Sequence, residues 1–256
     1  MLTACHNTRF LVYNLGMSQR ALEILSIKFV IEVYDPPPQV PDFALRFERG
    51  STAFKAVVIA DAIISQGCTR GFWGDASIRH ARLCQNGTLP SRPLSMYWGG
   101  SDGLHTYTGP NHEYTHPDTY RYFLTERSDN KHIMWQAGTI LFDSSIPIWP
   151  GVLCRYLYCA LRVQCILPDG AIIRTQLVKE WKEIDGILYK VHRDDQSVLN
   201  LAILDTVRVS GADYLLGKLN YCVTIHRDSQ ITQQQKVQLA EYLISRSRSK
   251  GITVSS

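Results

Sequence analysis

Apolar and polar residues alternate in several stretches of the chain, and such alternation is typical of half-buried β-strands. Residues 24–34 show it first, with Ile31 and Val33 on either side of Glu32. Residues 43–48 predict a returning strand. The connection between them, residues 35–42, contains three consecutive prolines. Because proline cannot donate a hydrogen bond to a sheet, this connection is predicted to be a stiff surface loop.

The second half of the chain carries more alternating stretches, separated by turn signals. The sequences Pro168-Asp169-Gly170 and Ile184-Asp185-Gly186 both favour tight turns. Strands joined by short turns must be antiparallel, so this half predicts an antiparallel β-meander. Residues 198–209 are ambiguous between strand and helix. The predicted strands cover residues 119–126, 132–142, 153–166, 171–179, 187–193 and 221–226.

Helices are predicted where apolar residues crowd together behind a capping residue. Residues 52–66 are apolar on most sides, begin at Ser51 or Thr52 and end at Gly67, which predicts a deeply buried helix packed on a sheet. Asp61 within it is predicted to face outward. A short helix is predicted at residues 75–83, and a final helix at residues 232–245.

These elements predict an α+β fold, with an antiparallel meander in the C-terminal half and a few packed helices. The 256 residues can bury a full core, and a single domain over residues 1–256 is predicted. Its predicted parts are an N-terminal sub-lobe (1–92), a loop rich in aromatic residues, Gly and His (85–118), and a β-rich C-terminal lobe (119–256).

Composition and charge describe an ordinary globular protein. Apolar residues make up 45% and charged residues 20% of the chain, and all of the net charge of +4 arises after residue 150. Arg246, Arg248 and Lys250 follow the last predicted helix and could bind an anionic surface, either nucleic acid or a membrane face. Trp98 and Tyr107 in the long loop could stack on bases. The alternative is that the three cations only complement the helix dipole.

The cysteines and the apolar segments bear on location. Seven cysteines without a C-x-x-C pair do not predict a disulfide framework or a zinc ribbon. Cys154, Cys159 and Cys165 are predicted to be free, buried thiols on one strand. The sequence shows no secretory signal and no apolar run long enough for a transmembrane segment. It therefore predicts an intracellular, cytoplasmic protein that is not secreted.

One string resembles a known chemical motif. His112-Glu113-Tyr114-Thr115-His116 spells H-E-x-x-H, which on a helix holds zinc through two histidines while the glutamate activates water. Pro117 disfavours helical angles at His116, and the residues before His112 are rich in helix breakers. The candidate metal ligands of this region are His105, His112 and His116, but no metal or other cofactor is predicted.

The sequence leaves two hypotheses for function. The first is a non-enzymatic structural or assembly protein that forms homo-oligomers and binds a protein or an anionic surface, with a pattern of elements that would suit a viral matrix protein. The alternative is a metal-assisted hydrolase that uses the histidines of residues 97–116. A near-repeat, Val191-His192-Arg193-Asp194 and Ile225-His226-Arg227-Asp228, is attributed to shared turn chemistry.

Overall fold

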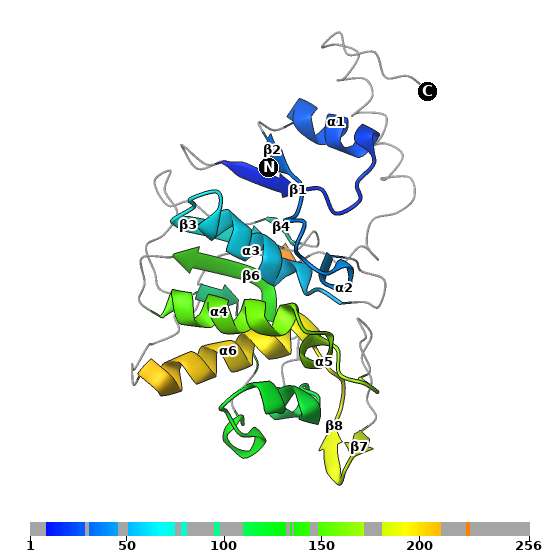
Figure 1. Cartoon of the computed structure of the whole chain (residues 1–256), viewed down its shortest axis with the longest axis vertical. Coiled ribbons are helices and arrows are strands. Elements are labelled where there is room, and N and C mark those ends of the chain that lie inside the picture. The colour runs from blue at the N-terminus through cyan, green and yellow to red at the C-terminus, as the bar shows by residue number, and fades with distance from the viewer. Residues whose placement is uncertain are drawn as a thin grey trace. The chain divides into compact units, whose positions relative to one another are not determined.

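The computed structural model describes residues 9–28, 31–45, 51–74, 78–80, 95–97, 110–131, 134, 136–143, 148–171, 181–210 and 224–225. The chain forms two compact units. Unit 1 consists of Met1–Asp35, Ala76–Leu89 and Tyr221–Ser256, and unit 2 of Pro36–Asp75 and Pro90–Asn220. Each unit is therefore built from segments that are distant in the sequence. Helices and small sheets occur together, as the predicted α+β class requires (Figure 1).

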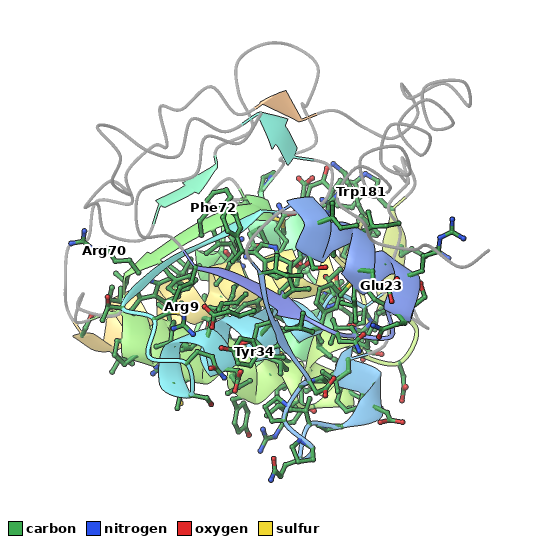
Figure 2. All side chains as sticks on the ribbon, turned by 90° about the horizontal axis from the view of Figure 1, so that it is seen from above. Arg9, Glu23, Tyr34, Arg70, Phe72 and Trp181 are labelled. Carbon is green, nitrogen blue, oxygen red and sulfur yellow. A yellow bond between two sulfur atoms is a disulfide. The ribbon has the colours of Figure 1, made fainter. Side chains whose placement is uncertain are left out.

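Unit 1 contains a β-α-β arrangement. Strands β1 (Phe10–Tyr13) and β2 (Ile31–Tyr34) pair in parallel, and helix α1 (Gln19–Lys28) connects them. Strands β4 (Ile78–His80) and β9 (Thr224–Ile225) form an antiparallel pair. Arg9 binds Glu32 through two nitrogen atoms, at 2.6 and 2.7 Å, and it also donates to Tyr34, which lies close by in Figure 2. The bonds from Arg9 lower the pKa of Glu32 to about 2.

Unit 2 combines an antiparallel sheet with three longer helices. The sheet has the order β3 (Arg70–Gly74), β6 (Gln136–Asp143), β5 (Ser95–Tyr97). In Figure 1, α4 lies between α3 and α6. The helices are α2 (Asp42–Leu45), α3 (Phe54–Ile64), α4 (Trp149–Ala160), α5 (Val163–Ile166) and α6 (Asp194–Ser210), with 3₁₀ helices η2 (Asn111–Glu113), η3 (Pro117–Tyr122) and η4 (Arg127–Asp129). Strands β7 (Lys182–Ile184) and β8 (Ile187–Tyr189) form a separate antiparallel hairpin.

The core of unit 2 lies between the sheet and these helices. Its largest buried side chains include Trp149 and Tyr156 of α4, which are 2% and 1% exposed. The rings of Phe142 and Trp149 meet edge to face, with centroids 6.1 Å apart. Gly71 lies directly under Phe142, and a Cβ atom there would come within 1.9 Å of the ring. Glycine is therefore required at this position for β3 to pair with β6.

The buried helix predicted at residues 52–66 is confirmed by α3. Its residues from Lys55 to Ala60 are all buried, and Gly67 beyond its end has a φ of +67°, which glycine adopts without strain. Asp61 is partly exposed and accepts from Gln66. The hairpin predicted around Asp185-Gly186 is also confirmed. Residues 198–209 lie within α6, which resolves the ambiguity in favour of a helix.

Several predicted elements are wrong. The strand predicted at residues 153–166 is α4 followed by α5, and the one at residues 119–126 includes part of η3. Residues 24–34 contain the end of α1 as well as β2, while residues 43–48 begin within α2. The helix predicted at residues 75–83 contains strand β4. Of the strands predicted in the second half of the chain, β6, the β7–β8 hairpin and β9, within residues 221–226, are described. Residues 172–180 and the helix predicted at residues 232–245 lie outside the described residues.

The prediction of free thiols is wrong for two cysteines. Cys159 at the end of α4 and Cys165 in α5 form a disulfide, and both are fully buried. Cys154 is free as predicted, but it is exposed and not buried; Cys68 is free and partly exposed. Sequence spacing could not pair Cys159 with Cys165, because the strand predicted over both residues would hold them too far apart to bond.

Candidate functional site

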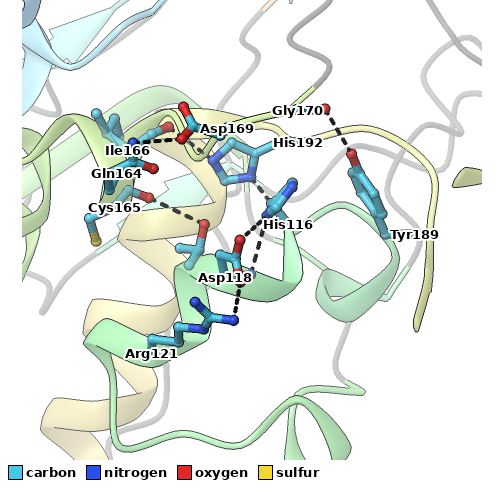
Figure 3. A network of polar contacts seen from close by, with 11 residues as sticks. His116, Asp118, Arg121, Gln164, Cys165, Ile166, Asp169, Gly170, Tyr189 and His192 are labelled. Atoms are coloured by element: carbon cyan, nitrogen blue, oxygen red, sulfur yellow. Dashed lines mark hydrogen bonds and ion pairs between the residues drawn. The ribbon is translucent and has the colours of Figure 1, made fainter. Parts of the chain in front are cut away.

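The chain enters α6 through four residues, His192 to Asp195, that contact four different parts of unit 2. His192 is fully buried, and its Nε2 lies 3.0 Å from the carbonyl oxygen of Ile166 (Figure 3). Because a carbonyl can only accept, Nε2 carries the proton and Nδ1 is free to accept. The backbone N–H of His116 donates to that Nδ1 at 3.2 Å. Burial lowers the pKa of His192 to about 3, so the ring is neutral.

His116 is a capping residue in this structure. Its backbone has φ −59° and ψ 136°, as expected of a residue before proline, and its Nδ1 accepts from the backbone N–H of Asp118 at 3.2 Å. The ring is fully buried and meets Tyr189 edge to face, with centroids 5.1 Å apart. Burial lowers the pKa of His116. The residue therefore fixes the start of η3.

The other two members of the H-E-x-x-H string contact different groups. Nδ1 of His112 lies 3.2 Å from the carbonyl oxygen of Asn130. Glu113 forms an ion pair with Lys190, Oε2 to Nζ 2.5 Å, and its carbonyl oxygen accepts from the Lys190 backbone at 2.7 Å. Within the described residues, no three His, Cys, Asp or Glu side chains are placed to share a metal ion. His105 lies outside the described residues.

Asp194 and Asp195 connect the start of α6 to α3. Oδ2 of Asp194 accepts from the backbone and the hydroxyl of Thr52, at 2.6 and 2.9 Å. Oδ2 of Asp195 lies 2.7 Å from Nζ of Lys55, which is buried within α3. Burial, reinforced by the charge of Asp195, raises the pKa of Asp194 to about 7. One buried ammonium thus faces two carboxyl groups that share the start of one helix.

Asp205 of α6 binds the segment of residues 110–131, which we call the strap. Both of its carboxylate oxygens accept backbone N–H groups, from Leu124 and Thr125, at 2.7 Å each. The hydroxyl of Thr125 donates to it as well, at 2.5 Å. Nearer the start of the strap, the carbonyl oxygen of Tyr114 accepts from Arg193 and Ser197 of the α6 region. The strap is therefore bound to α6 at both of that helix's ends.

These contacts define a polar centre, made of His116, His192, Asp194, Asp195 and Lys55. Every member is less than 10% exposed. Buried charges without partners are costly, and here both carboxyl groups and the one ammonium have partners. Both imidazoles are bonded through Nδ1, while Nε2 of His116 has no hydrogen-bond partner. The arrangement can hold α3, α6 and the strap in a fixed relation. The signal that pointed to it was the His-Arg-Asp-Asp segment, which the sequence interpretation assigned to a turn.

The β7–β8 hairpin differs from this centre because it presents apolar side chains to solvent. Asp185 and Gly186 both have positive φ, 51° and 76°, as a two-residue hairpin turn requires. Trp181 and Leu188 are each 48% exposed. Nζ of Lys190 lies 4.6 Å from the centre of the Trp181 ring, which places the two side chains on the same face of the hairpin.

The binding residues predicted from sequence are not placed by the structure. Trp98, Tyr107, Arg246, Arg248 and Lys250 lie outside the described residues. Sequence analysis missed Lys55, which appeared to be one polar position in an apolar helix, and Trp181, which no motif marked. Trp181 could have been found from the strand that leads into the Asp185-Gly186 turn. Because side chains alternate along a strand, Trp181 shares a face with the charged residue Glu183, and that face is expected to be exposed.

Comparisons with known proteins found no match for the chain. It matches no protein-family model, and neither the curated proteins nor the solved structures yield a match. None of the helices formed by the described residues has both the length and the apolar character needed to cross a bilayer. Function must therefore be argued from the geometry above.

Proposed function

We propose that the chain is a non-enzymatic assembly protein that associates with further copies of itself. The observation that supports this proposal is the exposure of large apolar side chains on unit 2. Trp181 and Leu188 are exposed on the hairpin, and Leu124 and Val209 are 62% and 60% exposed beside the far end of α6. Large apolar side chains that gather on one exposed face often mark a site where another protein binds.

The contacts made by the H-E-x-x-H residues also favour an assembly protein over the hydrolase alternative. Glu113 would have to activate a metal-bound water, but its carboxylate is paired with Lys190. His116 would have to bind the metal, but its ring is completely buried and its Nδ1 accepts from Asp118. Its Nε2 has no hydrogen-bond partner, yet the described residues place no group of three possible metal ligands. Glu113 and His116 thus hold the strap in place. An assembly protein that forms layers, as viral matrix proteins do, needs surfaces that bind neighbouring copies and a fold that holds those surfaces in place.

An anionic surface is the proposed second partner. The support is the sequence alone: Arg246, Arg248 and Lys250 carry three cations within five residues. Such a cluster attracts phosphate groups, with a strength that falls as salt is added. A layer-forming protein with a basic end could coat a membrane face or a nucleic acid, and the experiment below separates these two surfaces.

The proposal is tested by measuring the size of the purified full chain by sedimentation velocity over a range of concentration and salt. Self-association is expected, and it should weaken when Trp181→Ser and Leu188→Ser are combined. Ile64→Ser, which changes a side chain that is 71% exposed on α3, is the matched control. A chain that stays monomeric at millimolar concentration would contradict the proposal. Sedimentation with anionic vesicles, and separately with single-stranded DNA, tests the second partner.

A further inference from the structure

We infer that two copies of the chain pair face to face through the outward face of the β7–β8 hairpin, about a two-fold axis along the Trp181–Leu188 diagonal. The inference rests on the proposed function, because it names the surface and the partner through which self-association occurs. The face consists of Trp181, Glu183, Leu188 and Lys190, and we call it the hairpin face.

The strand register places these four side chains together. Glu183 is paired directly with Leu188, and Lys182 with Tyr189. Side chains alternate along a strand, so Trp181 and Lys190 share a face with Glu183 and Leu188, as the contact of Lys190 with the Trp181 ring confirms. Tyr189 points the other way and is fully buried. Because Tyr189 is buried on the opposite side of the hairpin, the hairpin face points towards solvent.

The four positions form a rectangle that is complementary to itself. Trp181 and Leu188 occupy one diagonal, while Glu183 and Lys190 occupy the other. A two-fold axis along the apolar diagonal places Trp181 on its equivalent and Leu188 on its equivalent. The same rotation brings each Glu183 against Lys190 of the other copy. Symmetric pairs of this kind are the commonest interfaces in oligomers, and sheet faces do pack with their strands crossed.

The edges of the hairpin are less suited to pairing than its face. On the β8 edge, the carbonyl oxygen of Leu188 accepts from Arg127, and the N–H of Lys190 donates to Glu113. On the β7 edge, antiparallel pairing of two copies would place Lys182 opposite Lys182, or Glu183 opposite Glu183. Like charges directly opposite each other destabilise a strand pair, and an edge lysine is a common protection against such pairing.

The size of the face predicts a weak complex. Stable protein interfaces bury about 800 Å² on each partner, and four side chains of a two-stranded hairpin cover less than that. Dissociation constants in the high micromolar range or weaker are therefore expected for an isolated pair. Weak symmetric contacts suit a protein that must assemble at high local concentration and separate again.

A charge-swap experiment tests the pairing on the full chain. One variant carries Glu183→Lys; the other carries Lys190→Glu together with Glu113→Lys, which keeps the ion pair within the chain. Each variant alone brings like charges together on both sides of the two-fold axis and should self-associate about tenfold more weakly or worse. Mixed, the two variants present opposite charges at both contacts, and sedimentation equilibrium should show a mixed dimer of nearly the parent's strength.

The outcomes separate this inference from the proposed function. If the parent chain self-associates but the charge changes have no effect, or the mixture does not recover, the hairpin face is not the interface and the proposed function still stands. If the parent is monomeric, both are overturned. A Lys182→Thr variant decides between face and edge: tighter association would favour the β7 edge and contradict the inference, while unchanged association supports it. Recovery in the mixture also shows that the variants are folded.

Discussion

The hairpin face and the part of the polar centre that begins α6 lie only a few residues apart in the sequence, yet they distribute polarity in opposite ways. Leu188 and Trp181 are apolar and half exposed, whereas His192 and Asp194, shortly after β8, are polar and buried. Composition therefore does not decide which side chains are inside. Three polar residues are buried where distant segments supply partners: Ile166 for His192, Thr52 for Asp194 and Lys55 for Asp195.

The difference has an energetic meaning that experiments can examine. A polar group inside the protein stabilises the fold only while its partner is present, and removing one partner leaves the full cost of its desolvation. An exposed apolar group contributes little to the isolated fold. Substitutions in the polar centre should therefore change the free energy of unfolding strongly, and substitutions on the hairpin face should change it weakly.

The largest effect is expected for Lys55→Met. The change removes the ammonium that faces Asp195 and leaves buried carboxyl groups without a counter-charge, so the free energy of unfolding should fall by about 3–5 kcal/mol. Urea denaturation followed by circular dichroism measures it. Lys182→Met on the exposed strand β7 is the control and should stay within about 0.5 kcal/mol. If adding Asp195→Leu to Lys55→Met restores no stability, the ion pair is not the cause of the loss.

The next effect concerns the strap. Asp205→Ala removes the acceptor of three donors at Leu124 and Thr125, two of them backbone groups, and should cost about 3 kcal/mol. Hydrogen exchange of the peptide covering residues 120–131 should accelerate more than that of α3. Asp205→Asn retains one side-chain oxygen that can accept, so its free energy of unfolding and its exchange rate should lie between those of the parent chain and Asp205→Ala. Equal exchange in all three would show that Asp205 does not hold the strap.

Sequence reasoning was reliable where the signal was local. Helix α3 was predicted because its apolar residues have no polar side to present, and the β7–β8 hairpin because Asp-Gly favours positive φ at both turn positions. The prediction failed for α4, where the apolar residues Leu157, Cys159 and Leu161 at and just beyond its end occupy every second position. The buried residues of that helix are instead spaced by the helical repeat: Trp149, Val152, Leu153, Tyr156, Cys159 and Ala160.

The polar centre could not be predicted for a different reason. Its hydrogen bonds join residues that are 76 and 142 positions apart, and no local pattern records such contacts. The same holds for the Cys159–Cys165 disulfide, which depended on recognising a helix that ends between the two residues. In the H-E-x-x-H string only the effect of Pro117 on its neighbour was local, and that expectation is confirmed in the backbone angles of His116.

The disulfide provides an effect of intermediate size. Closing the loop between Cys159 and Cys165, which are six positions apart, should contribute roughly 2 kcal/mol by restricting the unfolded chain. Cys159→Ser should lower the free energy of unfolding by about that amount under oxidising conditions. The parent treated with a dithiol reductant should match the variant. Mass spectrometry after alkylation without reduction should find these two cysteines protected, and labelling of both would contradict the bond.

The pH dependence of stability separates two members of the polar centre. The pKa of His192 is lowered to about 3, so the fold prefers the neutral ring, and its contribution is lost as pH falls below the ordinary value of 6.5. The pKa of Asp194 is raised to about 7, so the fold prefers the protonated acid, and its contribution is lost as pH rises from 3.8 towards 7. The two contributions oppose each other between about pH 4 and pH 6.5.

Single variants should reveal the opposing slopes. Asp194→Asn leaves the His192 contribution, so stability should fall by about 1.4 kcal/mol for each pH unit below 6.5. His192→Gln can still donate to Ile166 but does not titrate, so the Asp194 contribution should make this variant gain stability over the same range. Denaturant titrations at several pH values compare the two. Parallel profiles would show that neither group is protonated as its burial requires.

The smallest effect on the isolated chain is expected for Leu188→Ala on the hairpin face. The side chain is already half exposed, so its truncation should change the free energy of unfolding by no more than about 0.5 kcal/mol. Tyr189→Ala, one residue along the same strand, removes a fully buried ring that contacts His116 and should cost about 3–5 kcal/mol. Measuring both at concentrations low enough to prevent self-association keeps the comparison within one chain. A large loss for Leu188→Ala under those conditions would mean that this face supports the fold of its own chain, and it would then have to be excluded as a surface kept for a second copy.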